Sequence, residues 1–174
     1  MGNLVRHKRS VIRAALVCLM AFGLMPACAL FGGGGEGSWA RAEKYSVTAP
    51  PSWRIRNKES SDRAYQLPSG NVATLTSSCN RNPDTPLPIL TKHLLFGTRN
   101  VVYERKEPIT VDGAQGLLSK VRTTMDGSKF HMELVVVVKN GCVFDFTLVS
   151  PKDLPDGDES DFLTFVRSFR YGTH

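Results

Sequence analysis

The sequence feature that most constrains the fold is a pair of apolar segments, residues 129–139 and 142–150, separated only by Asn140-Gly141. An Asn-Gly pair supplies the two positive φ angles of a tight hairpin loop, so the segments are predicted to form neighbouring antiparallel strands. A two-residue loop also sets the register of the ladder. The facing pairs that it predicts are Lys139 with Cys142, Val137 with Phe144, and Val135 with Phe146.

Both faces of this predicted hairpin are apolar. One face holds Val135, Val137, Phe144, Phe146 and Leu148. The other holds Phe130, Met132, Leu134, Val136, Val138, Val143 and Val149. Successive residues of a strand point to opposite sides, so a strand that is apolar on both faces is covered on both. The hairpin is therefore predicted to lie at the centre of a sheet.

Turn signals divide the rest of the domain into further strands and a first helix. Strands are predicted at residues 44–48, 63–67, 71–77, 101–109 and 114–124. A proline cluster at 83–88 introduces the helix, with Asp84 or Thr85 as its cap and Gly97 at its end. The helix is predicted from the spacing of Leu87, Leu90 and Leu94.

A second helix near the C-terminus can cover one face of the sheet. Its narrow apolar stripe consists of Phe162, Phe165, Val166 and Phe169. Acidic residues lie at its start and Arg167 and Arg170 at its end, which complements the helix dipole. The predicted fold class is α+β: an antiparallel sheet of six to seven strands flanked by helices on both faces.

The N-terminal segment has the three parts of an export signal. A cationic stretch from Arg6 to Arg13 precedes an apolar run, 14–25, and then Pro26-Ala27-Cys28. This segment up to residue 27 carries four of the 22 basic residues and no acid, which leaves 18 bases against 16 acids. The exported part therefore gives no reason to expect nucleic-acid binding.

Cys28 is the predicted point of attachment to a membrane. The segment Met25-Pro26-Ala27-Cys28 resembles the lipobox of bacterial lipoproteins, in which the cysteine thiol takes a diacylglycerol and its amine takes an acyl chain such as palmitate. Two alternatives stay open: a plain signal-peptidase site at Ala27–Ala29, and an uncleaved apolar anchor. Because Ala29 is not the aspartate of the enterobacterial retention signal, the expected location is the outer membrane, facing the periplasm.

Three regions follow from this organisation. Residues 1–28 form the signal peptide and lipobox, and residues 29–43 form a Gly-rich tether. Residues 44–171 form a single domain.

The domain resembles the PsbP-like superfamily. The resemblance rests on Tyr45–Trp53 (Tyr-Ser-Val-Thr-Ala-Pro-Pro-Ser-Trp), the long antiparallel meander, and a closing helix with Phe165 and Ser168-Phe169. That group includes the photosystem protein PsbP, the Ran-binding Mog proteins and many bacterial lipoproteins. It implies an α/β/α sandwich that binds a larger partner and is not an enzyme, with no shared catalytic motif to assign to residues of this chain.

The remaining candidate site residues are few. If Cys28 is lipidated, Cys79 and Cys142 remain as an even pair in an oxidising compartment, which favours a disulfide over two buried thiols. His131 and Glu133 share one strand face, but two ligands do not make a metal site, so solvent-facing or pairing roles are expected. No cofactor is expected.

These observations favour a non-catalytic binding or accessory module for an envelope protein complex, tethered to a membrane. Such a module would carry an exposed apolar or aromatic patch away from the core. The alternative is a carrier of a lipid or another small apolar ligand, which would need an apolar cavity. A hydrolytic enzyme ranks last, because the sequence shows no nucleophile grouped with a base.

Overall fold

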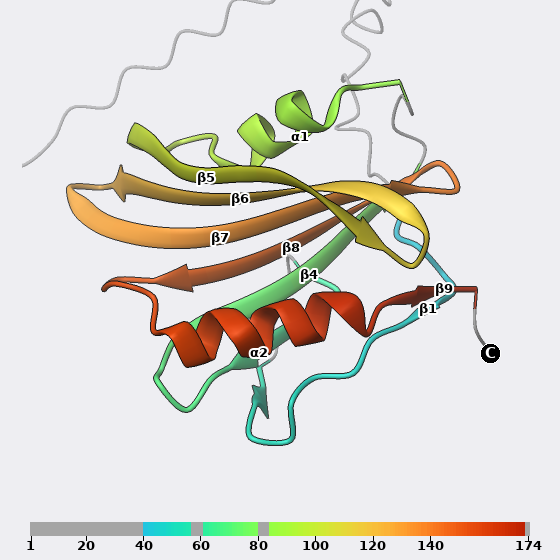
Figure 1. Cartoon of the computed structure of the whole chain (residues 1–174), viewed down its shortest axis with the longest axis horizontal. Coiled ribbons are helices and arrows are strands. Elements are labelled where there is room, and N and C mark those ends of the chain that lie inside the picture. Colours follow the sequence, from blue (N-terminus) through green and yellow to red (C-terminus); the bar gives the residue numbers. More distant parts are fainter. Residues whose placement is uncertain (1–39, 57–60, 80–83, 173–174) are drawn as a thin grey trace, which may run out of the picture. The chain divides into compact units, whose positions relative to one another are not determined.

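The computed structural model describes residues 40–56, 61–79 and 84–172. In chain order the elements are β1 (Tyr45–Ser46), β2 (Arg54–Ile55), β3 (Arg63–Gln66), β4 (Val72–Cys79), α1 (Leu87–Leu94), β5 (Arg99–Val111), β6 (Ala114–Met125), β7 (Ser128–Lys139), β8 (Cys142–Ser150), α2 (Asp156–Arg167) and β9 (Arg170–Tyr171). Seven strands form one antiparallel sheet in the order β2-β3-β4-β8-β7-β6-β5, and β1 pairs with β9 in a separate ladder (Figure 1).

The central hairpin has the predicted register. Lys139 faces Cys142, Val137 faces Phe144 and Val135 faces Phe146 in the β7–β8 ladder. Asn140 and Gly141 between them have φ angles of 50° and 74°, as a tight loop of this kind requires. The hairpin is central because another strand pairs with each of its edges: β4 pairs with β8, and β6 pairs with β7.

The two predicted faces of the hairpin contribute to different groups of buried side chains. The first face packs with α2 in a cluster that contains Val135, Val137, Phe144, Phe162 and Phe165. The second face contributes Val136 and Val143 to a cluster with Leu90 of α1. Helix α1 contacts β6 and β7, and helix α2 contacts β8. Figure 1 shows the two helices on either side of the ribbons of the sheet.

The helix ends differ in two details from the prediction. The N-cap of α1 is Pro86, not Asp84 or Thr85, and no side chain caps the helix. Proline serves here because its fixed φ suits the start of a helix, and its missing N–H costs nothing there. The apolar stripe of α2 extends one residue past the C-cap Ser168, so Phe169 is buried from outside the helix.

The pairings β2–β3 and β1–β9 complete the fold. Tyr45 faces Tyr171 in the β1–β9 ladder, so the two ends of the domain meet. Residues 40–43, which the sequence places in the tether, are held against β4: the backbone N–H of Cys79 donates to the carbonyl oxygen of Ala40 at 2.7 Å. The contacts of the domain therefore include Ala40, four residues before Lys44.

Candidate docking surface

Large apolar side chains are exposed at one end of the sheet. We call this group the distal patch; it consists of Phe96, Val101, Val102, Tyr103 and Met125. Phe96 follows α1 and is 92% exposed, and Val102 in β5 is 49% exposed. Because Arg99 faces Thr124 in the β5–β6 ladder, the start of β5 and the end of β6 lie side by side.

The backbone explains why β5 presents these side chains. β5 is the edge strand, and its register against β6 shifts between Arg99 and Val102 and again between Tyr103 and Arg105. Such bulges bend a strand and increase its twist, which disrupts a regular ladder. Asn100 has a φ of 54° at the first shift, a conformation that asparagine tolerates better than most residues. The start of β5 thus presents side chains to solvent on an irregular edge.

A hollow of about 520 Å³ lies next to the distal patch. We call it the β5–β7 hollow; its lining residues are Asn100, Val102, Arg122, Thr123, Thr124, Lys129, Phe130, His131 and Asp153. Val102 belongs both to the hollow and to the distal patch, so the two features meet at this residue. None of the lining residues belongs to α1 or α2.

Titratable side chains line this hollow, and most of them are paired. Arg122, Lys129 and His131 line it, against one acidic residue, Asp153. The His131 imidazole lies 3.1 Å from a carboxylate oxygen of Asp153, whose side chain is 96% exposed. His131 thus has the pairing role that the sequence favoured. The Arg122 guanidinium lies 2.5 Å from the carboxylate of Glu104, which does not line the hollow.

The carboxyl group of Glu133 is buried. The sequence had predicted a solvent-facing or pairing role for this residue. Glu133 has no exposed surface, and neither of its oxygens accepts a hydrogen bond from a described residue. Burial, and next the nearby Glu159, raise the pKa of Glu133 to about 7. The strand alternation could have revealed this, because Glu133 shares its face with Val135 and Val137.

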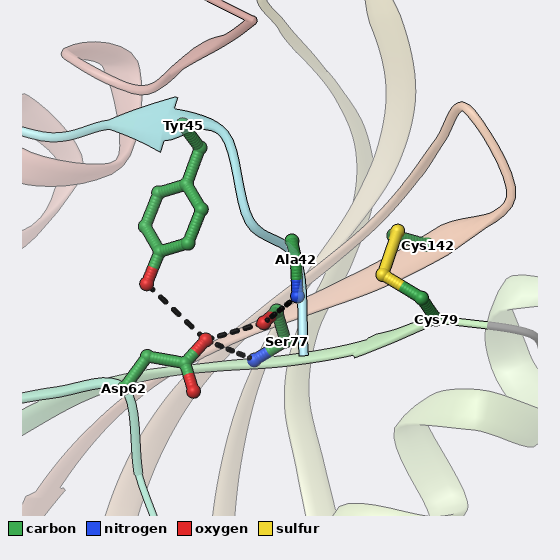
Figure 2. Close-up of a disulfide and its surroundings, with 6 residues drawn as sticks. All are labelled: Ala42, Tyr45, Asp62, Ser77, Cys79 and Cys142. Atoms are coloured by element: carbon green, nitrogen blue, oxygen red, sulfur yellow. Dashed lines mark hydrogen bonds between the residues drawn. A yellow bond between two sulfur atoms is a disulfide. The ribbon is translucent and has the colours of Figure 1, made fainter. Parts of the chain in front are cut away.

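The opposite end of the sheet holds the beginning of the described chain. Figure 2 shows Asp62 accepting hydrogen bonds there from the Tyr45 hydroxyl at 3.2 Å and from the Ser77 backbone N–H at 2.8 Å. The Ser77 hydroxyl and the Arg41 guanidinium also donate to Asp62. The Ser77 hydroxyl oxygen in turn accepts from the backbone N–H of Ala42 at 2.9 Å. Asp62 therefore fixes residues 41–45 to β4.

The predicted disulfide lies beside these contacts. Cys79 ends β4, Cys142 begins β8, and the two residues face each other in the ladder and are bonded through their sulfur atoms (Figure 2). The prediction of a Cys79–Cys142 bridge is confirmed. The predicted lipidation site, Cys28, lies outside the described residues.

The chain enters the domain at the end of the sheet away from the distal patch. Residue 40 contacts Cys79 at the end of β4. The end of β4 pairs with the start of β8, which in turn pairs with the end of β7. Met125 of the patch faces Ser128 at the start of β7. The end of the sheet where the chain enters and the end that holds the distal patch are separated by the length of β7. The 12 residues of this strand span about 35 Å.

Two features are absent from the described residues. Within residues 40–56, 61–79 and 84–172, no group of three or more histidine, cysteine, aspartate or glutamate side chains is placed to hold a metal ion. Neither helix in that part of the chain has the length and hydropathy needed to cross a bilayer.

Comparison with known proteins identifies the fold. No protein-family model matches the sequence, and no curated protein matches it either. The structure is similar to that of cyanobacterial PsbP (CyanoP) from Synechocystis, with 18% identity, a TM-score of 0.56, and coverage of 80% of this chain and 96% of the other. It is also similar to LpqN of Mycobacterium tuberculosis, a protein involved in cell envelope biogenesis, with 13% identity, a TM-score of 0.51, and coverage of 80% and 88%. The domain has a PsbP-like fold, which confirms the resemblance predicted from sequence.

Proposed function

We propose that this chain is a membrane-anchored periplasmic lipoprotein that docks an envelope protein complex as a non-catalytic accessory module. The distal patch is the docking surface. The observation that carries the proposal is the position of this patch: exposed apolar side chains gather at the end of the sheet opposite the point where the chain enters the domain.

An exposed aromatic residue at this place needs a reason. A phenylalanine that is 92% exposed, as Phe96 is, keeps its apolar surface in water and gains nothing from the core. Contiguous exposed apolar groups rimmed by polar residues are typical of interaction sites. Aromatic anchors such as Phe96 and Tyr103 supply much of the binding energy at protein interfaces. A partner that covers the patch would remove this surface from water.

The route of the chain supports the same function. A lipid on Cys28 and a Gly-rich tether before residue 40 would hold the Cys79 end of the sheet toward the membrane. The distal patch, about 35 Å away along β7, would then face the partner. Ala29 favours the outer membrane, facing the periplasm. The fold shared with LpqN, whose described role is in cell envelope biogenesis, agrees with this location.

The proposal also includes the order of the layers in the domain, with one helix on each face of the sheet. Val135 packs in the cluster of α2, and its neighbour Val136 packs in the cluster of α1. Successive residues of β7 point to opposite sides of the sheet. These contacts support the proposed α/β/α sandwich, with a helix on each face of the sheet.

Site-specific photocrosslinking in the native host tests the proposal. The full anchored chain would carry p-benzoylphenylalanine at position 96, in the distal patch, and in a second strain at position 55. Ile55 is 80% exposed in β2, at the other edge of the sheet, so it is a matched control. Docking through the patch predicts one dominant envelope protein captured from position 96 and not from position 55.

Two results would contradict the proposal. Equal capture from both positions would show that the patch is not a specific surface. Absence of any protein adduct at position 96, with efficient photolysis, would remove the docking function. A lipid recovered in stoichiometric amount from the purified full chain would favour the alternative function, a carrier of small apolar ligands.

A further inference from the structure

One side of α1 is exposed and leads into the distal patch. We call its four exposed residues the outer stripe of α1: Ile89, Lys92, His93 and Phe96. They share one side of the helix, because residues three and four apart are neighbours on a helix surface. The turn continues past the last helical residue, Leu94, since the Phe96 N–H donates to the carbonyl oxygen of His93 at 3.2 Å. The outer stripe therefore ends at the most exposed residue of the distal patch.

The segment that contains the outer stripe is basic. Between residues 85 and 103 the sequence has Lys92, His93 and Arg99, and it has no aspartate or glutamate. Lys106 adds a further cation, because its ammonium group lies 5.0 Å from the centre of the Tyr103 ring in the distal patch. Lys92, Arg99 and Lys106 form no ion pair with any described residue. Their charges thus have no counter-ion in this part of the chain.

Acidic residues near this end of the sheet do not neutralise these cations. Both acids of β5 already have partners. Glu104 pairs with Arg122, and Glu107 pairs with Arg105. Asp126, in the turn between β6 and β7, forms no ion pair with a described residue, but it is one acid against three cations. The outer stripe and the distal patch thus combine apolar side chains with an excess of unpaired positive charge.

Covering Phe96 imposes a condition on the partner. Lys92 precedes Phe96 by four residues and Arg99 follows it by three, so a partner that removes the ring from water also removes water from these cations. A charge that loses its water without gaining a counter-ion costs free energy. Because no described residue pairs with Lys92 or Arg99, the partner has to supply that counter-ion. Complementary charge also speeds association and excludes partners of the same sign.

The edge of β5 is unsuited to the addition of a partner strand. Its register against β6 shifts twice within residues 99–105, which interrupts the regular row of backbone groups that a new strand needs. Further along β5, Pro108 has no N–H to donate to such a strand. Recognition at this end therefore depends on side chains and their charge.

Resting on the proposed function, we propose that the partner presents an acidic segment with at least one large apolar side chain to the outer stripe of α1 and the distal patch. Its carboxylates pair with Lys92 and Arg99, and its apolar side chain packs against Phe96. An anionic membrane offers similar chemistry. A protein is favoured because the distal patch lies at the end of the sheet opposite the one where residue 40 enters the domain.

Peptide selection on the detergent-solubilised full chain tests this assignment. A random twelve-residue phage library would be selected on the wild-type chain, and the selected peptides would be assayed on charge-reversal variants. The stripe variant is Lys92→Glu with Arg99→Glu. The matched control is Arg54→Glu with Arg56→Glu, which makes the same change of charge on two exposed arginines beside the exposed Ile55.

The expected result is enrichment of peptides that contain both acidic and large apolar residues. Their affinity should fall about tenfold on the stripe variant and little on the control, since each exposed ion pair contributes modestly. Phe96→Ser, which keeps the charges, should also reduce the affinity about tenfold, because it removes the aromatic anchor. Affinity should fall as salt rises. If the stripe variant does not fold, Lys92→Gln with Arg99→Gln replaces it.

Peptides without acidic bias, or acidic peptides that bind the stripe variant as well as wild type, would overturn the assignment. So would binding to phosphatidylglycerol vesicles that the stripe variant loses, with no peptide selected. Crosslinking from position 96 separates the two proposals. If that crosslink keeps its full yield when Lys92 and Arg99 are replaced by glutamate, docking stands and the acidic segment does not. Absence of the crosslink in the otherwise wild-type chain removes the docking function itself.

Discussion

Glu133 lies directly opposite Lys120 in the β6–β7 ladder, yet the Lys120 ammonium group is bonded to Glu159 in the first turn of α2. The Glu133 carboxyl group is left buried beside this pair, and neither oxygen accepts a hydrogen bond within the described part of the chain. A buried carboxylate without hydrogen bonds is costly, so the neutral form is favoured. The Lys120–Glu159 contact between β6 and α2 thus lies beside a carboxyl group whose pKa is raised to about 7.

This arrangement predicts a pH-dependent stability. The pKa of Glu133 is raised from 4.5 to about 7 in the folded state, so the folded chain holds a proton that the unfolded chain has lost between these values. Stability should therefore fall as pH rises through this window, by about 3 kcal/mol in all. Glu133→Gln should match wild type at pH 4.5 and be more stable at pH 8. Urea unfolding across pH measures the difference.

Two neighbouring residues make this prediction specific. The positive charge of Lys120 lowers the pKa of Glu133, and the negative charge of Glu159 raises it. Lys120→Met should therefore move the midpoint of the stability change to higher pH, and Glu159→Gln should move it to lower pH. An unchanged midpoint in both variants, or the same pH slope in Glu133→Gln as in wild type, would rule out Glu133 as the group responsible.

The disulfide should be a major source of stability. Cys79 and Cys142 are separated by 63 residues in the sequence, and closing a loop of this length stabilises a fold by about 4 kcal/mol on the chain-entropy model. The double variant Cys79→Ala with Cys142→Ala should lose that amount in guanidinium unfolding. A reducing agent should destabilise wild type equally and leave the double variant unaffected. A reductant effect on the double variant would point to another cause.

Asp62 should control how firmly residues 41–45 are attached to the domain. Asp62→Ala leaves the N–H and hydroxyl of Ser77 and the hydroxyl of Tyr45 without their acceptor, which should cost about 2 kcal/mol. Trypsin should then cleave after Arg41 and Lys44 faster than in wild type, because local opening is easier. Limited proteolysis followed by mass spectrometry gives the rates at both sites.

Tyr45→Phe is the matched control for Asp62→Ala. It removes one hydrogen bond of 3.2 Å and keeps the ring, which stacks on Phe169 and meets Phe144 edge to face. Its cost should not exceed about 1 kcal/mol. Equal acceleration of cleavage in both variants would mean that the Tyr45–Asp62 hydrogen bond alone holds this segment, and that the contacts of Asp62 with Ser77 and Arg41 do not contribute.

The meander could be predicted from sequence because its turns carry their own signal. Asp112, Asp126 and Asn140 all have positive φ, and each is followed by a glycine with positive φ. Such pairs set the hairpin loops directly, and the register follows from the loop length. The disulfide was predictable for a different reason: with Cys28 set aside, Cys79 and Cys142 are an even pair in an oxidising compartment.

Other parts depend on tertiary contacts that the sequence pattern does not show. β2 and β9 have two residues each, too few for any periodicity, and exist because β3 and β1 pair with them. The distal patch was missed for another reason. Val101, Val102 and Tyr103 read as an ordinary apolar strand, and only the bulges in β5 and its edge position leave them exposed.

Gly116 tests how tightly the sheet is packed at one backbone position. A Cβ atom at Gly116 in β6 would lie 2.9 Å from the carbonyl oxygen of Val136 and 3.0 Å from a methyl group of Val137. Because the first of these is backbone and the second is buried, neither can move without cost. Gly116→Ala should therefore lower the free energy of unfolding by about 2 kcal/mol.

Gly157→Ala is the matched control, since the same substitution meets open space in the first turn of α2. It should raise stability by about 0.5 kcal/mol, because alanine restricts the unfolded chain and favours helix. Thermal unfolding of both variants beside wild type gives the two shifts, which should differ in sign. If Gly116→Ala proves neutral, the β6–β7 pair must be able to move apart, and the close approach of Gly116 to Val136 would not constrain the sheet.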